Sequence, residues 1–265
     1  MFIEFILGGA LVGFIVGATG VGGGSLMTPL LTLVFGIPAQ IAVGTDLLFA
    51  SITKMQGVFA HARRGNVEWR LTGWMAAGSL PASLATLAVL KAWSPNPVQF
   101  AALVRPALAV ALLLTSIGLM LKPRIQSLGL RMQGRHAADP AAGAGNSLRP
   151  IATVVLGAVI GVMVTLTSVG AGVIGVVALF FLYPALSAKR LVAVDIAHAV
   201  PLTLLAGLGH ATLGTVNWTV LGALLIGSLP AIWLGAMVAD RLPETGLRGF
   251  LATMLILIGA RLALV

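Results

Sequence analysis

Eight apolar segments make up most of this chain, and they restrict its fold more than any other feature. They cover roughly residues 2–35, 40–60, 70–90, 99–121, 151–183, 190–210, 217–238 and 247–264. A membrane-spanning helix needs about 20 mostly apolar residues, and each segment is long enough for at least one. Only 9% of the residues are charged, whereas a soluble domain carries about 25%. The sequence therefore predicts an all-α, polytopic integral membrane protein.

A hydrophilic stretch at about 122–149 divides the chain, and the sequences on its two sides match each other. The matched pairs are HARRGNVEW (61–69) with HATLGTVNW (210–218), GSLPA (78–82) with GSLPA (227–231), Asp46 with Asp195, and, one residue earlier in register, TGVGGG (19–24) with TSVGAG (167–172). Fixed-offset similarity of this kind is typical of duplication. We predict two homologous membrane repeats of four hydrophobic segments, 1–121 and 151–265. A flexible cytoplasmic linker, 122–150, joins them.

The first segment of each repeat, 2–35 or 151–183, is longer than one span and is interrupted by glycine-rich sequence. Each one either crosses the membrane as a Gly-broken helix or turns back as a re-entrant hairpin. Irregular backbone at membrane depth is tolerated only where protein or water satisfies it. Broken helices at corresponding positions of two repeats are a sequence indicator of a transporter's binding site.

The basic residues favour the hairpin, because cytoplasmic loops of membrane proteins are enriched in Lys and Arg. With two hairpins, twelve basic residues share one side and three lie opposite; with two crossings, the division is nine against six. The twelve are Arg63, Arg64, Arg70, Lys122, Arg124, Arg131, Arg135, Arg149, Lys189, Arg190, Arg241 and Arg248. Three full spans per repeat would make the two repeats inverted.

Both glycine clusters are candidate anion-binding sites. Glycine permits backbone conformations in which consecutive N–H groups face one ligand, and the start of the next half-helix adds positive potential. The candidate substrate-binding residues there are Thr19, Gly20, Gly22, Gly23, Gly24 and Ser25 in the first repeat, and Thr167, Ser168, Gly170 and Gly172 in the second. The alternative is that these small residues serve only close helix packing.

Ionisable residues lie within two of the apolar segments, where they are expensive and indicate function. Asp46 and Lys54 are on one, Asp195 and His198 on the other. Lys54 is a candidate substrate cation, and its alternative is snorkelling to the interface. Asp46, Asp195 and His198 are candidates for proton coupling, since an imidazole one turn from a carboxylate can carry a proton. The alternative for both aspartates is capping of helix starts.

Motifs of enzymes are missing from the sequence. It contains no HExxH, no GxSxG and no lysine after the GVGGGS run, so neither catalysis nor nucleotide binding is expected. The chain has no cysteine, and we expect no metal and no cofactor. The net charge of +9 fits cationic loops on one side of a membrane better than nucleic-acid binding.

The run GFIVGATGVGGGSLMTPLL, followed by AVGTDLLFASITKMQGVFAHARRGNVEW, resembles the TauE/SafE family. That resemblance covers the whole chain and implies an exporter of sulfite or organosulfur anions, such as C2 sulfonates, in the bacterial inner membrane. The second half departs from the first, since TSVGAG has fewer glycines and Thr203 stands where the first half has Lys54.

The working hypothesis is a secondary transporter that exports a small anion by alternating access with proton coupling. Its partners would be the anion, protons and the lipid bilayer, with a homodimer left open. Two alternatives remain: a passive anion channel, or a transporter of another small metabolite.

Overall fold

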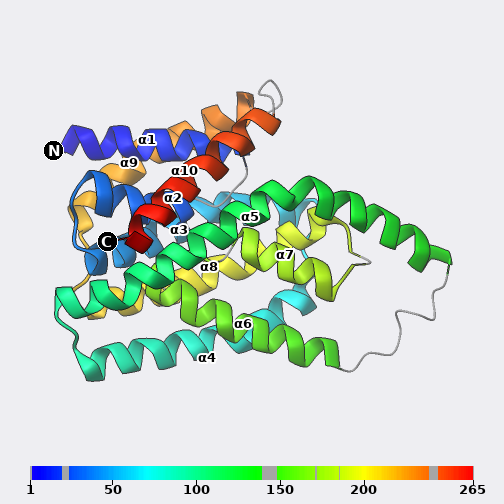
Figure 1. The fold of residues 1–265 in the computed structure, drawn as a ribbon, viewed down its shortest axis with the longest axis horizontal. Helices are drawn as coiled ribbons and strands as arrows, with labels where there is room; N and C mark the ends of the chain where they lie inside the picture. The colour runs from blue at the N-terminus through cyan, green and yellow to red at the C-terminus, as the bar shows by residue number, and fades with distance from the viewer. Residues whose placement is uncertain are drawn as a thin grey trace.

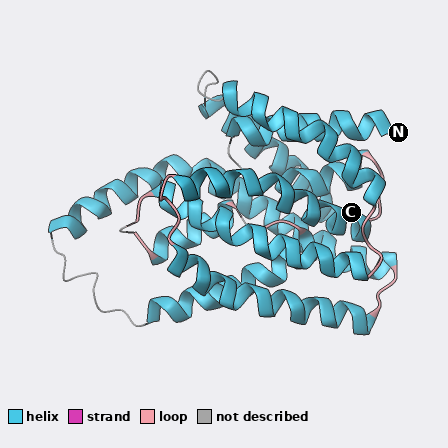
Figure 2. Cartoon of the chain, turned by 180° about the vertical axis from the view of Figure 1, so that it is seen from behind, coloured by secondary structure: helices cyan, strands magenta, loops and turns pink. Residues whose placement is uncertain are grey.

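The computed structural model describes residues 2–19, 24–138, 148–170, 172–184, 186–238 and 244–264. These residues form helices joined by short loops, with no strand among them (Figures 1 and 2). The helices are α1 (Phe2–Thr19), α2 (Gly24–Pro29), the π-helix η1 (Leu30–Val34), α3 (Ala39–Arg63), α4 (Trp69–Trp93), α5 (Pro97–Ala138), α6 (Leu148–Thr167), α7 (Val173–Leu182), α8 (Ala188–Thr212), α9 (Trp218–Val238) and α10 (Glu244–Leu264).

The long opening segment of each half folds back on itself. In the first half, Phe35 follows η1 and its ring centroid lies 4.8 Å from that of Phe5 near the start of α1. In the second half, the hydroxyl of Tyr183, just after α7, lies 2.8 Å from the Thr153 hydroxyl near the start of α6. Each segment therefore ends beside its own beginning. This arrangement is a hairpin and not a broken helix that crosses once.

Each hairpin packs its first helix on the other half of the chain, through glycines. Along α1, Gly9 and Gly13 lie against the backbone of Leu224 and Ser228 on α9. The GxxxG spacing of α1 brings these glycines to one face, so the two backbones approach closely. Figure 1 shows α1 beside α9 along one edge of the molecule.

At the opposite edge, α6 packs on α4 in the same way (Figure 1). Gly157 and Gly161 of α6 lie against Met75 and Ser79 of α4. In both pairs the residue numbers rise together, so α1 runs parallel to α9 and α6 runs parallel to α4.

The central pair, α3 and α8, is antiparallel. Gly44 lies against His210, while Gly57, near the other end of α3, faces Ile196. Short loops join α3 to α4 and α8 to α9, so each of these consecutive pairs is also antiparallel. Because α1 is parallel to α9 and α6 is parallel to α4, it follows that α1 and α3 run in one direction and α6 and α8 in the other.

Basic residues gather at one end of the bundle as a result. Arg63 ends α3, Arg70 follows the first residue of α4, and Arg190 lies in the first turn of α8. There Arg190 donates to Glu68 across 2.6 Å, which ties the start of α8 to the start of α4. Lys91 lies in the last turn of α4, at the other end of the bundle.

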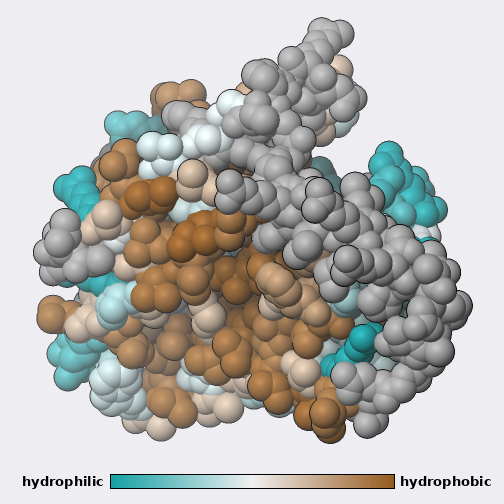
Figure 3. All heavy atoms as spheres, turned by 45° about the vertical axis from the view of Figure 1, so that its right-hand side comes forward, coloured by the Kyte–Doolittle hydropathy of each residue, from teal (hydrophilic) through white to brown (hydrophobic). Residues whose placement is uncertain are grey.

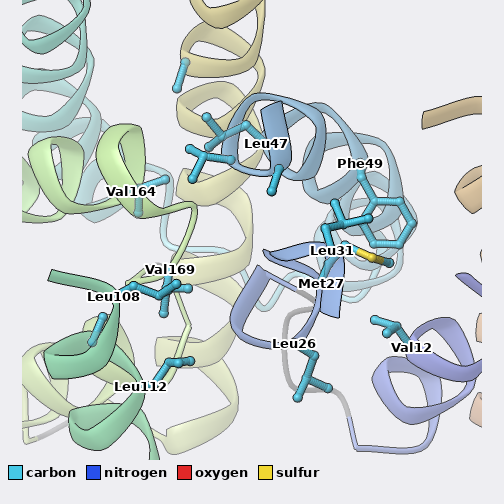
Figure 4. Packing of buried hydrophobic residues seen from close by; sticks show 14 of the residues in the cluster. Val12, Leu26, Met27, Leu31, Leu47, Phe49, Leu108, Leu112, Val164 and Val169 are labelled. Carbon is cyan, nitrogen blue, oxygen red and sulfur yellow. The ribbon is translucent and has the colours of Figure 1, made fainter. Parts of the chain in front are cut away.

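The interior and the surface are both apolar. Buried side chains of α2 and η1, such as Met27 and Leu31, pack beside Phe49 of α3 (Figure 4). A wide hydrophobic area also covers the outside between hydrophilic margins (Figure 3). Five of the described helices are long and apolar enough to cross a membrane: α4, the Pro97–Leu121 part of α5, α6, α8 and α9. The chain is a polytopic, all-α membrane protein.

The stretch after residue 121 differs from the flexible linker expected. Helix α5 continues to Ala138, so the first part of the 122–150 linker is helical. Its Arg, Gln, Leu, Met and Ala residues have high helix propensity, and a helix that is already formed propagates more easily than one that must nucleate. Residues 139–147 lie outside the described part of the chain.

The glycine contacts predict that only glycines at a helix–helix contact are needed to hold the two halves together. A Cβ on Gly78 of α4 would meet the carbonyl oxygen of Val154 on α6, whereas a Cβ on Gly73 of the same helix meets nothing within 4 Å. We expect Gly78→Ala to destabilise the protein by about 1–3 kcal/mol through overpacking, and Gly73→Ala to have no such cost. Thermal unfolding in detergent would measure both. Equal melting temperatures would contradict this packing.

Candidate functional site

The charged residues of the interior lie on α3 and α8, the two helices that cross at the centre. Leu48 of α3 contacts Gly207 of α8 at this crossing. Asp46 and His198 are fully buried, and Asp195 is 2% exposed. Lys54 is 9% exposed. Two carboxylates, an ammonium group and an imidazole are therefore enclosed where the two halves of the chain meet.

Asp46 supports the first hairpin. Its Oδ2 accepts hydrogen bonds from the backbone N–H of Thr28, at 3.1 Å, and from the Thr28 hydroxyl, at 2.5 Å. Thr28 lies in the short helix α2, where a proline at position 29 ends the regular α-helix. The carboxylate thus holds a neighbouring hairpin helix, and it does not cap the start of α3, which lies seven residues earlier.

Asp195 has the equivalent place beside the second hairpin. It lies against the backbone of Gly172, the residue that precedes α7. A Cβ on Gly175 of α7 would meet its Oδ1. Glycine at 175 therefore lets the helix approach the carboxylate closely.

Lys54 lies within electrostatic range of both carboxylates. Its ammonium group interacts electrostatically with Asp195, which belongs to the other half of the chain, and with Asp46. It is also close enough to His198 to act on it. Snorkelling to the interface, the alternative considered for this residue, would have left the side chain exposed.

The second hairpin tip is described except for residue 171, and its backbone is irregular. Ser168 has a φ of +60°, Gly170 of +130° and Gly172 of +136°. The Thr167 hydroxyl donates to the Met163 carbonyl at 2.7 Å and accepts from the Val169 N–H at 3.1 Å. This tip is buried (Figure 4), with Val169 near Leu108 and Leu112 of α5.

Ser168 connects this tip to the other half. Its hydroxyl faces the carboxylate of Asp46, but Ser168 Oγ has no hydrogen-bond partner of standard geometry among the described residues. The structure thus brings together Asp46 and Lys54 of α3, Ser168 of the second hairpin tip and Asp195 of α8, from three different segments.

The first hairpin tip is described only in part. Gly20, Gly22 and Gly23 lie outside the described residues. Thr19 is the last residue of α1, and Gly24 and Ser25 open α2; the side chains of Thr19 and Ser25 are outside the described set. The predicted cradle at this tip stays a prediction.

His198 is placed differently from the carboxylate–imidazole pair considered above. Its Nε2 lies 2.7 Å from the hydroxyl of Ser79 on α4, and its Nδ1 has no hydrogen-bond partner among the described residues. Asp195 instead faces the hairpin and Lys54. Asp195 and His198 are three residues apart on α8, yet no hydrogen bond joins their side chains.

Two hydroxyl residues of this region were not predicted. Thr28 binds Asp46, and Ser79 binds His198. A signal was present for Ser79, since GSLPA occurs in both halves and Ser79 is its only hydroxyl residue. Thr28 had no comparable signal, because its partner is 18 residues away in the sequence.

Several buried polar atoms in this region lack a hydrogen-bond partner within the described ranges. They include Oδ1 of Asp46, Oδ1 of Asp195, Oγ of Ser168 and Nδ1 of His198. Buried polar groups are nearly always satisfied in proteins, and a buried charge without partners is costly. This cluster therefore has spare capacity for a proton or for a polar ligand.

A pocket of about 440 Å³ lies elsewhere, on the other side of η1. Its lining includes Thr32, Gly36 and Arg105. The Thr32 hydroxyl donates to the carbonyl of Thr28 at 3.0 Å, and the Thr28 hydroxyl binds Asp46. One helical turn thus separates this pocket from the charged cluster.

Comparison with known proteins gives a consistent result. The family model described as "Sulfite exporter TauE/SafE" matches residues 5–262. The chain is 32% identical to the "Probable membrane transporter protein YjnA" of Bacillus subtilis (strain 168), over 99% of this chain and 100% of that protein. It is 26% identical to YdhB of the same strain, also named a probable membrane transporter protein, over 90% of each chain.

A further relative comes from Xylella fastidiosa (strain Temecula1 / ATCC 700964). This "Probable membrane transporter protein" is 29% identical over 88% of this chain and 83% of its own length. No solved structure matches the chain. Because the family model and the YjnA alignment both cover nearly every residue, the chain belongs to the TauE/SafE family of membrane transporter proteins.

Proposed function

We propose that this protein is a secondary transporter that exports a small anion, such as sulfite or a sulfonate, by proton-coupled alternating access. The observation that carries the proposal is the buried cluster at the crossing of α3 and α8. Lys54 is the only buried Lys or Arg side chain among the described residues. It interacts with Asp46, which also faces the Ser168 hydroxyl of the second hairpin tip, and that hydroxyl has no hydrogen-bond partner within the described ranges.

The anion would be held by one charged group and several neutral donors. Lys54 supplies the positive charge and Ser168 a hydroxyl donor. The backbone around Gly170 and Gly172 supplies N–H groups in a conformation that favours glycine. Donors of these kinds suit an oxyanion, whose charge is spread over several oxygens. The tip at residues 19–25 would add a second set of donors from the first half.

The helix directions support two inverted repeats with a common origin. Corresponding glycines, Gly9 and Gly157, make corresponding contacts, with Leu224 and Met75. Inverted repeats with sites at their interface are a recurrent transporter architecture. The basic end of the bundle would face the cytoplasm under the positive-inside rule, which puts the 122–150 linker there and the protein in the bacterial inner membrane.

The pocket beside Arg105 fits a vestibule on the opposite side. It lies at the end of the bundle away from the Arg190–Glu68 ion pair, since Pro38 before α3 and Pro97 at the start of α5 both line it. A cationic side chain at its wall would attract anions. Rearrangement of η1 would then connect it with the central cluster, and π-helical turns often lie at functional sites.

Flux measurements test the proposal against its alternatives. Purified protein in liposomes should move radiolabelled sulfite, or members of a sulfonate panel (isethionate and methanesulfonate), with saturation and with a response to a pH gradient. A passive channel would show neither saturation nor pH coupling. Absence of flux for every anion tested would overturn the anion assignment and favour another small metabolite.

Lys54 provides the first mutational test. We expect Lys54→Met to weaken anion binding by about 10- to 150-fold, because a hydrogen bond to a charged group contributes about 1.5–3 kcal/mol. Lys54→Arg should keep part of the affinity. Lys91→Met, which removes an exposed lysine at the end of α4, is the matched control and should bind as the parent does. Binding is measured by isothermal calorimetry on protein whose melting temperature has been checked.

Gly170 provides the second test. Substitution by alanine strains the backbone because φ is +130°, so strain and ligand loss must be separated. Gly214, with φ of +71° and open space around it, lies in the loop after α8 and is a control for strain. We expect Gly170→Ala to abolish saturable flux and Gly214→Ala to keep it, with each variant destabilised by about 1–2 kcal/mol. Equal flux in the two variants would show that tip geometry is unimportant.

A further inference from the structure

The charges enclosed at the crossing of α3 and α8 do not balance. Asp46 and Asp195 carry two negative charges when ionised, and Lys54 carries one positive charge. Among the described residues, no other charged side chain is buried there, and His198 is neutral unless protonated. Adding an anion to a buried site that is already negative is unfavourable. A proton that arrives with the anion would offset the added charge.

The two carboxylates are unequal in their hydrogen bonds. Asp46 accepts two from Thr28, and the Ser168 hydroxyl also faces it. Donors of this kind stabilise a carboxylate anion. Asp195 has no side-chain donor among the described residues and rests on the backbone of Gly172. Its negative charge is supported mainly by Lys54, which comes from the other half of the chain.

The surroundings of Asp195 contain few other titratable groups. Lys54 of α3 interacts with it electrostatically, and Lys54 also interacts with Asp46. His198 lies one turn along α8, and its Nε2 shares a hydrogen bond with the hydroxyl of Ser79 on α4. The neighbouring parts of α7 and α6 present Gly175 and Ile160. Protonation of Asp195 would therefore remove the attraction that Lys54 feels from the other half of the chain.

We propose that the anion and one proton bind together, with the proton on Asp195 and the anion on the Lys54 ammonium group that this proton frees. The inference rests on the proposed anion transport and specifies its coupling. Asp46 stays ionised and keeps the first hairpin in place through Thr28. The proton then travels in the same direction as the anion, and anion and proton raise each other's affinity by the same factor.

Export of a divalent oxyanion with this stoichiometry moves net charge across the membrane. Two negative charges and one proton leave together, so one net negative charge moves outward. An inside-negative membrane potential favours that movement. No opposing flow of protons is required.

Binding measured against pH tests the inference. The probe is isethionate, a sulfonate that stays fully ionised, so that its own charge does not change. For the parent protein in detergent, we expect Kd to rise by about tenfold per pH unit once the pH exceeds the value at which Asp195 loses its proton. In weakly buffered solution, binding should take up about one proton per anion.

The variants assign the proton to a residue. Asp195→Asn should bind with a Kd that changes by less than about twofold across the same pH range and should take up no proton. Asp195→Ser is a second variant with the same expectation. Asp46→Asn and His198→Gln should keep the pH slope, even where Asp46→Asn lowers the melting temperature through the loss of its Thr28 contact.

Distinct outcomes separate this inference from the function on which it rests. Tighter binding at high pH, no proton uptake by the parent, or a pH slope that persists in both Asp195 variants would overturn the inference and leave anion transport standing. Loss of the slope in Asp46→Asn alone would move the proton to Asp46 and overturn it equally. Failure of isethionate, methanesulfonate and sulfite to bind at any pH would instead overturn the proposed function itself.

Discussion

Backbone that is neither helix nor strand must find all its hydrogen-bond partners within the protein when water is absent. This chain places such backbone at the tip of the second hairpin, at residues 168–170 and 172, and it buries the change from α-helix to π-helix between α2 and η1. The surrounding helices enclose both. Asp46 and Asp195 are the partners at depth: one binds Thr28, and the other lies against Gly172. The two buried carboxylates, in turn, supply the negative charges with which the buried Lys54 interacts.

The class of fold could be predicted from hydropathy alone, because long apolar segments have few other structures available to them. The fold-back of the opening segments also agrees with the charge distribution along the chain. What composition could not provide was the length of α5. The polar residues that extend α5 to Ala138 have high helix propensity and continue a helix that is already formed. Neither effect depends on hydropathy.

At the site, the residue types were predictable but their pairing was not. Asp46, Lys54, Asp195 and His198 were identified because ionisable groups are rare in apolar sequence, and the structure brings them into one region. Their partners depend on which helix faces which. His198 lies one turn from Asp195, yet its bond goes to Ser79 on α4, because α4 packs against that face of α8. Such contacts between distant segments leave no local pattern in the sequence.

The exchange of helices between the halves has a consequence for how the chain assembles. Gly9 and Gly13 on α1 contact residues about 215 positions later in the sequence, on α9. During synthesis, the first hairpin therefore enters the membrane long before its packing partner exists. Its glycine face must wait beside lipid or beside the insertion machinery until α9 emerges. Native contacts of such wide sequence separation form late and slowly, so the first half cannot complete its packing until most of the second half has been made.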